Sequence, residues 1–279
     1  MKLLKKEKKM KKISELDLAG KRVLMRCDFN VPLDKEGRVA DDYRIAEAVP
    51  SIEHVVNEGG RAVLSLEGLR YSTLPESRAR SLAPLPPQAA AYLTGPRRRL
   101  DVMTLKLWGV GWLSYQRRIA IPVRDWDGKL VTISGRCLDR HENGRWVPEQ
   151  RPKFLHGKGF KRDYFLFGEH LVERGLPGIL VEGHFDAMFL RQMGYPNTVA
   201  VMGSYLSQVQ VEKALTMFSE VAILADGDDA GRTAAHQWEH ALSGRVKVRP
   251  LAAQDGYDPD DYNAEELADL FLDNPFSSL

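Results

Sequence analysis

Three groups of carboxylates, each after an apolar, strand-like run, stand out in the second half of this 279-residue chain. The candidate ligands are Glu182 and Asp186 after "GILV", Asp226 and Asp228 after "VAILA", and Asp258 and Asp260 after "VKVRPL". Ligands of open α/β sheets bind beyond the carboxyl ends of the strands, so we expect these side chains to lie close together. Carboxylates that converge on one point repel one another and have raised pKa values unless a cation neutralises them.

The chemistry of this donor set favours divalent metal ions. Hard oxygen ligands with no His or Cys among them select Mg²⁺ or Mn²⁺, and we expect two or more ions. No zinc is expected, because Cys27 and Cys137 are the only cysteines and they form no CxxC pair. Ions held in this way bridge carboxylates to phosphate oxygens, so the sequence points to phosphoryl or nucleotidyl transfer.

A purely structural explanation stays open for single residues. Asp228 or Asp229 can cap the helix predicted over "AGRTAAHQWEHAL" by accepting hydrogen bonds from its free backbone N–H groups. Glu182 alone can be an acid at the start of a helix. Three groups at three strand ends are harder to explain as caps, so we interpret them together as a metal site.

The elements that must position these carboxylates alternate strand and helix between residues 178 and 251. This alternation predicts a mostly parallel sheet covered by helices. Ahead of it, "RRIAIPVRDWDGKLVTISGRCLD" predicts two strands joined by a turn at Asp127-Gly128. Residues 13–64 have a βαβ pattern, and the Pro-rich residues 70–100 indicate a linker or domain edge that includes a short helix over "PQAAAYL".

Charge and composition limit the partners and the compartment. The net charge is only +2, but "MKLLKKEKKMKK" and the Arg triplet at 97–99 are basic, whereas acids concentrate between Asp226 and Asp273. Such segregation suits a protein that holds a polyanion on one surface and cations at another site. Two isolated cysteines, no signal peptide and no run near the roughly 18 apolar residues of a membrane span predict a cytoplasmic protein with no membrane partner.

Several motifs resemble a known metal-binding domain. "LVEGHFDAM", "ILADGDDAGRTAA" and "DGYDPDD" resemble the Glu motif, the Asp-x-Asp motif and the trailing acidic motif of the TOPRIM domain. The flanking stretches "RRIAIPVRDWDGKLVTISGR", "RPKFLHGKGFKRDYFLFG" and "VAVMGSYLSQVQVEKAL" are similar to the catalytic core of bacterial-type and phage DNA primases, from about Gln88 to Tyr262. The resemblance implies an α/β fold with a TOPRIM-type, mostly parallel sheet flanked by helices, after a small mixed α+β basic subdomain.

The resemblance also implies roles for single residues. Glu182 matches a Glu that binds metal or acts as a general acid or base, and Asp226 and Asp228 match the Asp-x-Asp ligands; these three would be catalytic. The positions that match acids around a further ion are Asp186, Asp258 and Asp260. The positions that match basic residues for the template or the incoming nucleotide are Arg136, Lys153 and Lys161, each of which taken singly can also be a solvated surface charge. His156 stands where the family tends to have Asn.

The activity that the resemblance implies is synthesis of short RNA primers on single-stranded DNA from ribonucleoside triphosphates. Family members usually carry a zinc-binding module before this core and a helical subdomain after it, so we expect a separate zinc-binding module or a replicative helicase as further partners. The alternatives are a TOPRIM-type metal-dependent nuclease and an inactive nucleic-acid-binding remnant of a primase.

The front of the chain resembles a different family. Residues 13–64 are similar to the first, incomplete βαβ stretch of phosphoglycerate kinase, in which the positions of Asp28, Asn30 and Arg44 contact phosphoglycerate. The similarity is expected to end abruptly, without the ATP-binding half, so we predict no kinase activity and a chimeric or non-functional fragment with poor packing. The expected parts are a kinase-like fragment at 1–70, a primase core subdomain that binds template and nucleotide at 71–175, and a TOPRIM catalytic domain at 176–279.

Overall fold

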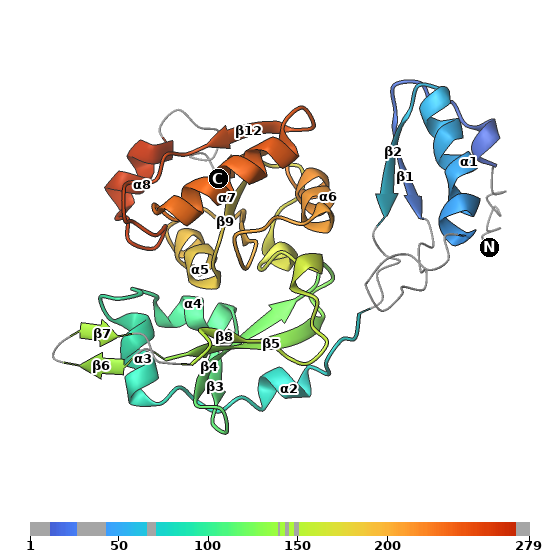
Figure 1. The fold of residues 1–279 in the computed structure, drawn as a ribbon. Coiled ribbons are helices and arrows are strands. Elements are labelled where there is room, and N and C mark those ends of the chain that lie inside the picture. The colour runs from blue at the N-terminus through green and yellow to red at the C-terminus, as the bar shows by residue number, and fades with distance from the viewer. Residues whose placement is uncertain are drawn as a thin grey trace, which may run out of the picture. The chain divides into compact units, whose positions relative to one another are not determined.

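The computed structural model describes residues 12–26, 43–65, 71–138, 140–142, 145–147 and 151–271 (Figure 1). The chain divides into two compact units, Met1–Arg70 and Tyr71–Leu279. Each unit has its own sheets and its own buried apolar residues.

The first unit is a βαβ element. Its described elements are a 3-10 turn η1 (Ile13–Glu15), β1 (Arg22–Arg26), α1 (Tyr43–Asn57) and β2 (Arg61–Ser65). The two strands are parallel, with Arg22 opposite Arg61, and helix α1 crosses between them. The buried apolar cluster consists of Leu18, Met25 and Val55 among the described residues. Asp28 and Asn30 lie outside the described residues, and Arg44 lies in α1 with a side chain that is not described.

The second unit begins with an antiparallel sheet and short helices. The helices are α2 (Ser77–Arg80), α3 (Pro87–Thr94) and α4 (Val102–Leu107). The sheet has the order β3-β4-β5-β8, with β3 (Gly111–Leu113), β4 (Arg118–Arg124), β5 (Leu130–Cys137) and β8 (Phe154–Leu155), and a separate hairpin pairs β6 (Arg140–Glu142) with β7 (Arg145–Val147). The predicted β4–β5 turn is confirmed: Gly128 has φ +78°, and Asp125 Oδ1 accepts from the backbone N–H groups of Asp127 and Lys129.

A four-stranded parallel sheet follows. Its order is β10-β9-β11-β12, with β9 (Gly178–Val181), β10 (Thr198–Ala200), β11 (Glu220–Ile223) and β12 (Lys247–Pro250). The helices around it are α5 (His184–Gln192), α6 (Gln208–Met217), α7 (Asp229–Leu242) and α8 (Ala264–Phe271), and the short 3-10 turns η3 (Arg162–Tyr164) and η4 (Glu169–Leu171) precede it. The predicted fold class, a parallel sheet flanked by helices after a smaller mixed subdomain, is confirmed (Figure 1).

Apolar periodicity explains why these elements pack as they do. All four residues of β9 are buried, as expected for a central parallel strand covered on both faces. Helix α7 buries Ala234, Trp238 and Leu242, which recur every four residues and therefore share one face. A single buried cluster contains Tyr92 of α3, Ile121 of β4 and other residues that lie in the parallel-sheet half, so the two halves of the second unit share one core.

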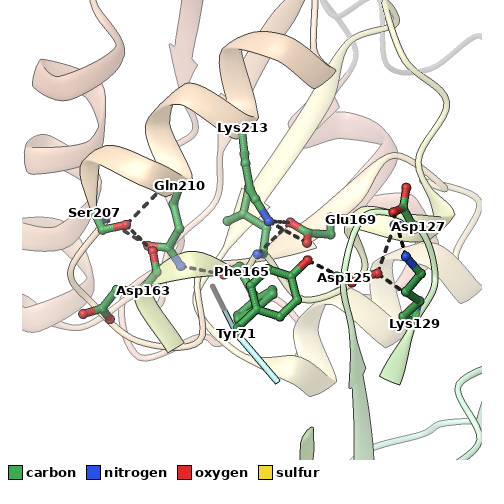
Figure 2. A network of polar contacts seen from close by, with 11 residues as sticks. Tyr71, Asp125, Asp127, Lys129, Asp163, Phe165, Glu169, Ser207, Gln210 and Lys213 are labelled. Carbon is green, nitrogen blue, oxygen red and sulfur yellow. Dashed lines mark hydrogen bonds and ion pairs between the residues drawn. The ribbon is translucent and has the colours of Figure 1, made fainter. Parts of the chain in front are cut away.

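A network of polar and aromatic contacts also joins these halves (Figure 2). Glu169 is buried, and Lys213 of α6 donates to its two carboxylate oxygens at 2.7 and 2.8 Å. The Lys213 ammonium also lies 5.0 Å from the centre of the Phe165 ring. Tyr71 packs edge-on against Phe165, with ring centroids 4.7 Å apart, and donates to Asp125 at 2.9 Å. The first residue of the second unit is thus bonded to the β4–β5 turn and packed against the segment that leads into β9.

Within the described ranges, no helix combines the length and the apolar character that crossing a bilayer requires.

Candidate metal and nucleotide site

Neighbouring parallel strands bring the first two carboxylate groups together. Strands β9 and β11 pair in register, with Leu180 opposite Ile223, and Glu182 and Asp226 follow their carboxyl ends. The Asp226 backbone N–H donates to Glu182 Oε1 at 3.3 Å, which links the two strand ends directly. The structure therefore brings Glu182 and Asp226 together at the edge of the sheet, as the parallel topology requires.

The electrostatics of this pair suit a site that binds a cation. Burial, followed by the nearby carboxylates of Glu182, Asp258 and Asp228, raises the pKa of Asp226 to about 7. Burial also raises the pKa of Glu182, and the Lys153 ammonium opposes the rise at both residues. Asp226 Oδ1 is buried and has no hydrogen-bond partner among the described residues. A buried, unpartnered oxygen among repelling carboxylates fits an Mg²⁺ or Mn²⁺ ligand.

Asp228 is compatible with both roles that the sequence left open, the cap of a helix and a ligand of a metal ion. Its Oδ1 accepts from the Gly231 backbone N–H at 2.7 Å, so Asp228 is the N-cap of α7. The side chain is nevertheless exposed and close enough to raise the pKa of Glu182 and of Asp226. Capping uses one carboxylate oxygen, which leaves the other for an ion. Gly231 is required here because a Cβ would lie 2.1 Å from the Asp226 carbonyl oxygen.

Backbone hydrogen bonds connect the third acidic segment, which carries Asp258, to the second, which carries Asp226. The Gly227 N–H donates to the Tyr257 carbonyl at 2.7 Å, and the Gly256 N–H donates to the Gly227 carbonyl at 2.8 Å. A Cβ at Gly227 would lie 2.0 Å from the Gln254 carbonyl oxygen, so only glycine allows this approach. The backbone therefore places the segment that carries Asp258 beside Asp226.

One oxygen from each of Asp258, Asp260 and Asp261 lies within 4.8 Å of the others. Burial raises the pKa of Asp258, and the carboxylates of Asp260 and Asp261 add to the rise. Asp260 is buried, and its Oδ1 has no hydrogen-bond partner within the described part of the chain. Asp255 lies apart from these three, in an exposed pair with Arg232 at 2.9 Å.

Asp186 lies in the first turn of α5. Its Oδ2 accepts from the Gly183 backbone N–H at 2.9 Å, which fixes the side chain toward the β9 end. Burial raises the pKa of Asp186 well above its ordinary value, and the nearby Asp260 and Asp226 carboxylates raise it further. Asp186 therefore lies near carboxylates of the second and third acidic groups, as the sequence pattern predicts.

A cavity of about 250 Å³ opens onto these carboxylates. Its acidic side consists of Glu182, Asp186, Asp226 and Asp258, and its other lining residues are Arg98, Arg136, Lys153, Phe154, His156, Arg162, Gly183, His184, Phe185, Met202 and Gly203. Of the three predicted basic residues, Arg136 and Lys153 line the cavity and Lys161 does not. Lys161 instead donates to the Tyr164 hydroxyl at 3.3 Å on the surface, and its neighbour Arg162 reaches the cavity.

Arg136 is held rigidly despite its charge. It is buried in β5, pairs across the ladder with Phe154, and donates to the Tyr92 hydroxyl at 3.3 Å. Its guanidinium lies 5.7 Å from the centre of the Phe154 ring. A guanidinium that is anchored in the lining of a cavity which carboxylates also line is well suited to bind a phosphate there.

Two uncharged histidines also line the cavity. His184 stacks on Phe154 with ring centroids 4.8 Å apart, and burial lowers the pKa of His184 to about 3. His156 Nδ1 lies 2.8 Å from the Ser134 hydroxyl, and burial also lowers the pKa of His156. Near pH 7 both rings are therefore uncharged, and the positive charge of the cavity comes from Arg and Lys.

The sequence interpretation missed Arg98 and His184. Arg98 forms a buried ion pair with Asp260, and its guanidinium lies 4.9 Å from the centre of the Phe185 ring. The signal was present in the Arg triplet at 97–99, which was interpreted only as part of the charge asymmetry. His184 lies between Glu182 and Asp186 in "EGHFD", where its type gives no sign of burial.

Two families match different parts of the chain. Residues 13–88 match the phosphoglycerate kinase family, and residues 178–252 match the Toprim domain. The kinase match runs past Leu64, where the sequence pattern placed its end, and past the boundary between the compact units. The Toprim match extends from β9 to β12, and the resemblance to this domain is confirmed.

DNA primases and phosphoglycerate kinases are both among the relatives of this chain. The DNA primase of Aquifex aeolicus is 36% identical over 160 residues, which cover 54% of this chain and 30% of the primase. The chain thus spans less than a third of that relative. The zinc-binding and RNA polymerase domains of Aquifex aeolicus primase align with a TM-score of 0.59 at 24% identity, over 81% of this chain and 66% of that chain. A DnaG primase catalytic domain bound to single-stranded DNA aligns with a TM-score of 0.57 at 18% identity, over 71% of this chain and 76% of that chain. The chain therefore has the fold of a primase catalytic core.

Proposed function

We propose that this chain acts as the catalytic core of a DNA primase, a nucleotidyltransferase that makes short RNA primers on single-stranded DNA during DNA replication. The observation that carries the proposal is the cavity that Glu182, Asp226 and Asp258 line together with Arg136 and Lys153. Carboxylates and cations around one cavity match a triphosphate that must be held by both metal ions and basic side chains.

The proposed reaction joins two nucleotides. The 3′-hydroxyl oxygen of one nucleotide attacks the α-phosphorus of the next triphosphate, the bond from that phosphorus to the bridging oxygen breaks, and pyrophosphate leaves. When bound by the carboxylates, Mg²⁺ or Mn²⁺ ions lower the pKa of the attacking hydroxyl and offset charge on the leaving group. We assign the ion-binding role to Asp226, Asp228 and Asp258, with Asp186 and Asp260 at a further ion.

The chain's own side chains supply the remaining parts. Burial raises the pKa of Glu182, which makes its carboxylate a stronger base for the hydroxyl proton, in addition to its proposed role as a metal ligand. Arg136 and Lys153 bind the triphosphate or the template phosphates without reading sequence. Lys161 is exposed outside the cavity, which suits a contact with the template further from the reacting atoms.

The proposed partners follow from this role. Single-stranded DNA is the template, and a solved DnaG catalytic domain with this fold was bound to single-stranded DNA. Ribonucleoside triphosphates are the substrates, a separate zinc-binding module or a replicative helicase would select the starting site, and the proposed location is the cytoplasm. Residues 1–70 have no role in this proposal.

Incorporation of labelled ribonucleotide into RNA complementary to a single-stranded DNA template tests the proposal, with Mg²⁺ or Mn²⁺ and the full chain. We expect product that requires metal, template and all needed nucleotides. Labelled DNA incubated with metal but no nucleotide is the control for the alternative activity. Cleavage of that DNA without primer synthesis would identify a nuclease and overturn the proposal, and metal binding with neither activity would indicate an inactive remnant.

A further inference from the structure

Asp260 uses its two carboxylate oxygens differently. Oδ2 accepts from the Arg98 guanidinium in an ion pair whose side chains are 5% and 1% exposed. Oδ1 is buried and has no hydrogen-bond partner among the described residues. A buried carboxylate oxygen without a partner is costly unless a cation binds it, so the two oxygens have separate tasks.

Arg98 itself is fixed in direction by other contacts. Its Nε lies 3.4 Å from the Tyr92 hydroxyl, and its guanidinium is 4.9 Å from the centre of the Phe185 ring. The same Tyr92 hydroxyl accepts from Arg136 at 3.3 Å, so the two buried arginines of the cavity share one anchor. A planar guanidinium held in this way orients a carboxylate better than a flexible ammonium does.

The next residue holds the backbone of the same segment. Arg99 donates to the carbonyl oxygens of Asp260 and Tyr262, the latter at 2.8 Å. Arg99 has φ +52°, a left-handed conformation that costs energy for a residue other than glycine. That conformation allows the side chains of two consecutive arginines to bind one segment. Arg98 binds the Asp260 side chain, and Arg99 binds main-chain carbonyl oxygens.

We propose that Arg98 is a positioning residue of the metal site, which binds Asp260 Oδ2 and thereby leaves Oδ1 directed to the ion. Partners that orient metal ligands typically set metal affinity within a factor of about 10–100. The inference rests on the proposed metal site and deepens it, because it ties the residues ahead of the antiparallel sheet to ion binding in the parallel sheet. A residue that only contacted the nucleotide would leave metal affinity unchanged when no nucleotide is present.

The test is Mn²⁺ binding to the full chain without nucleotide or DNA, measured by the electron paramagnetic resonance signal of free Mn²⁺. We expect Arg98→Gln to weaken Mn²⁺ binding about 10–100-fold and Arg98→Lys to restore part of the loss. Arg97→Gln is the matched control, because it removes the same charge from the same triplet and no hydrogen bond joins Arg97 to Asp260 among the described residues. Arg97 acts on Asp258 through its charge, so the control should bind Mn²⁺ as tightly as wild type or slightly more tightly.

The outcomes separate this inference from the proposed function. An equal loss in Arg97→Gln, which keeps the ion pair of Arg98 with Asp260, would show that the loss does not come from the orientation of Asp260 and would overturn the inference. Mn²⁺ binding by Arg98→Gln that is as tight as or tighter than that of wild type would also overturn it. If Arg98→Gln does not fold, Arg98→Lys decides: wild-type affinity in that folded variant overturns the inference. Failure of wild type to bind Mn²⁺ overturns both proposals, whereas normal Mn²⁺ binding without primer synthesis overturns only the primase activity.

Discussion

The two compact units differ in what their parallel strands carry. The first unit has two parallel strands, and its buried apolar cluster, among the described residues, is Leu18, Met25 and Val55. The second unit has four parallel strands, with acidic segments after β9, β11 and β12 that converge on one cavity. Both units match known families, but among the described residues converging acidic side chains are seen in the second unit. The difference teaches that a family match to one βαβ element says little about activity. Side chains that converge at strand ends are more informative about activity.

The largest expected effect comes from removing the converging carboxylates. Asp226→Ala with Asp228→Ala should reduce primer synthesis by more than the roughly 10–100-fold that loss of a ligand's outer partner costs, because ligands themselves are lost. Primer yield per enzyme on single-stranded DNA measures the effect. Asp229→Ala is the matched control, because Asp229 is exposed and pairs only with Arg232 among its described contacts. Equal losses in variant and control would contradict the assignment of the site.

The next effect concerns the contacts that hold the second unit together. Lys213→Met leaves the buried Glu169 carboxylate without its cation, so the free energy of unfolding should fall by about 3–5 kcal/mol. Urea unfolding of the full chain measures it. Lys247→Met is the control, because the Lys247 side chain is 71% exposed in its pair with Glu220, and we expect a loss below about 1 kcal/mol. A Lys213→Met transition that matches wild type would show that the network is dispensable.

A pH effect distinguishes the acidic cavity from ordinary surface acids. Between pH 3.8 and about 7, folded, metal-free protein keeps a proton on Asp226 that the unfolded chain has released. This contribution therefore lowers the free energy of unfolding as pH rises through that window. Asp226→Asn removes it, so the stability of the variant relative to wild type should grow from pH 4 to 7 and then level off. Urea midpoints in the presence of a chelator measure the difference, and a flat difference across this range would refute the raised pKa.

A smaller effect separates the two predicted lysines. Lys153 lines the cavity and Lys161 does not, so Lys153→Ala should raise the KM for nucleotide about tenfold, the effect of one hydrogen bond to a charged group. Lys161→Ala should change the KM much less. Steady-state incorporation at varied nucleotide concentration gives both values. A larger effect at Lys161 would mean that the triphosphate binds outside the cavity.

Much of the fold and the acidic half of the site could be predicted from the sequence, because strand ends and carboxylates are both local signals. Arg98 could not be predicted, since its partner Asp260 is 162 positions away in the chain and an Arg triplet has many solvated counterparts. Lys161 stays a predicted contact for the template outside the cavity, and its neighbour Arg162 is the residue of this pair that lines the cavity. A difference of one position in a 3-10 turn decides which side chain points inward, and no sequence pattern fixes that.

The measurement that tests the central comparison most directly is primer synthesis by the full chain, by residues 71–279, and by the Asp226→Ala, Asp228→Ala double variant. Circular dichroism should first show that each sample is folded. If the second unit carries the chemistry, the full chain and residues 71–279 make equal amounts of RNA and the double variant makes none. Loss of synthesis in a folded sample of residues 71–279 would contradict the account, because it would assign part of the activity to the first unit.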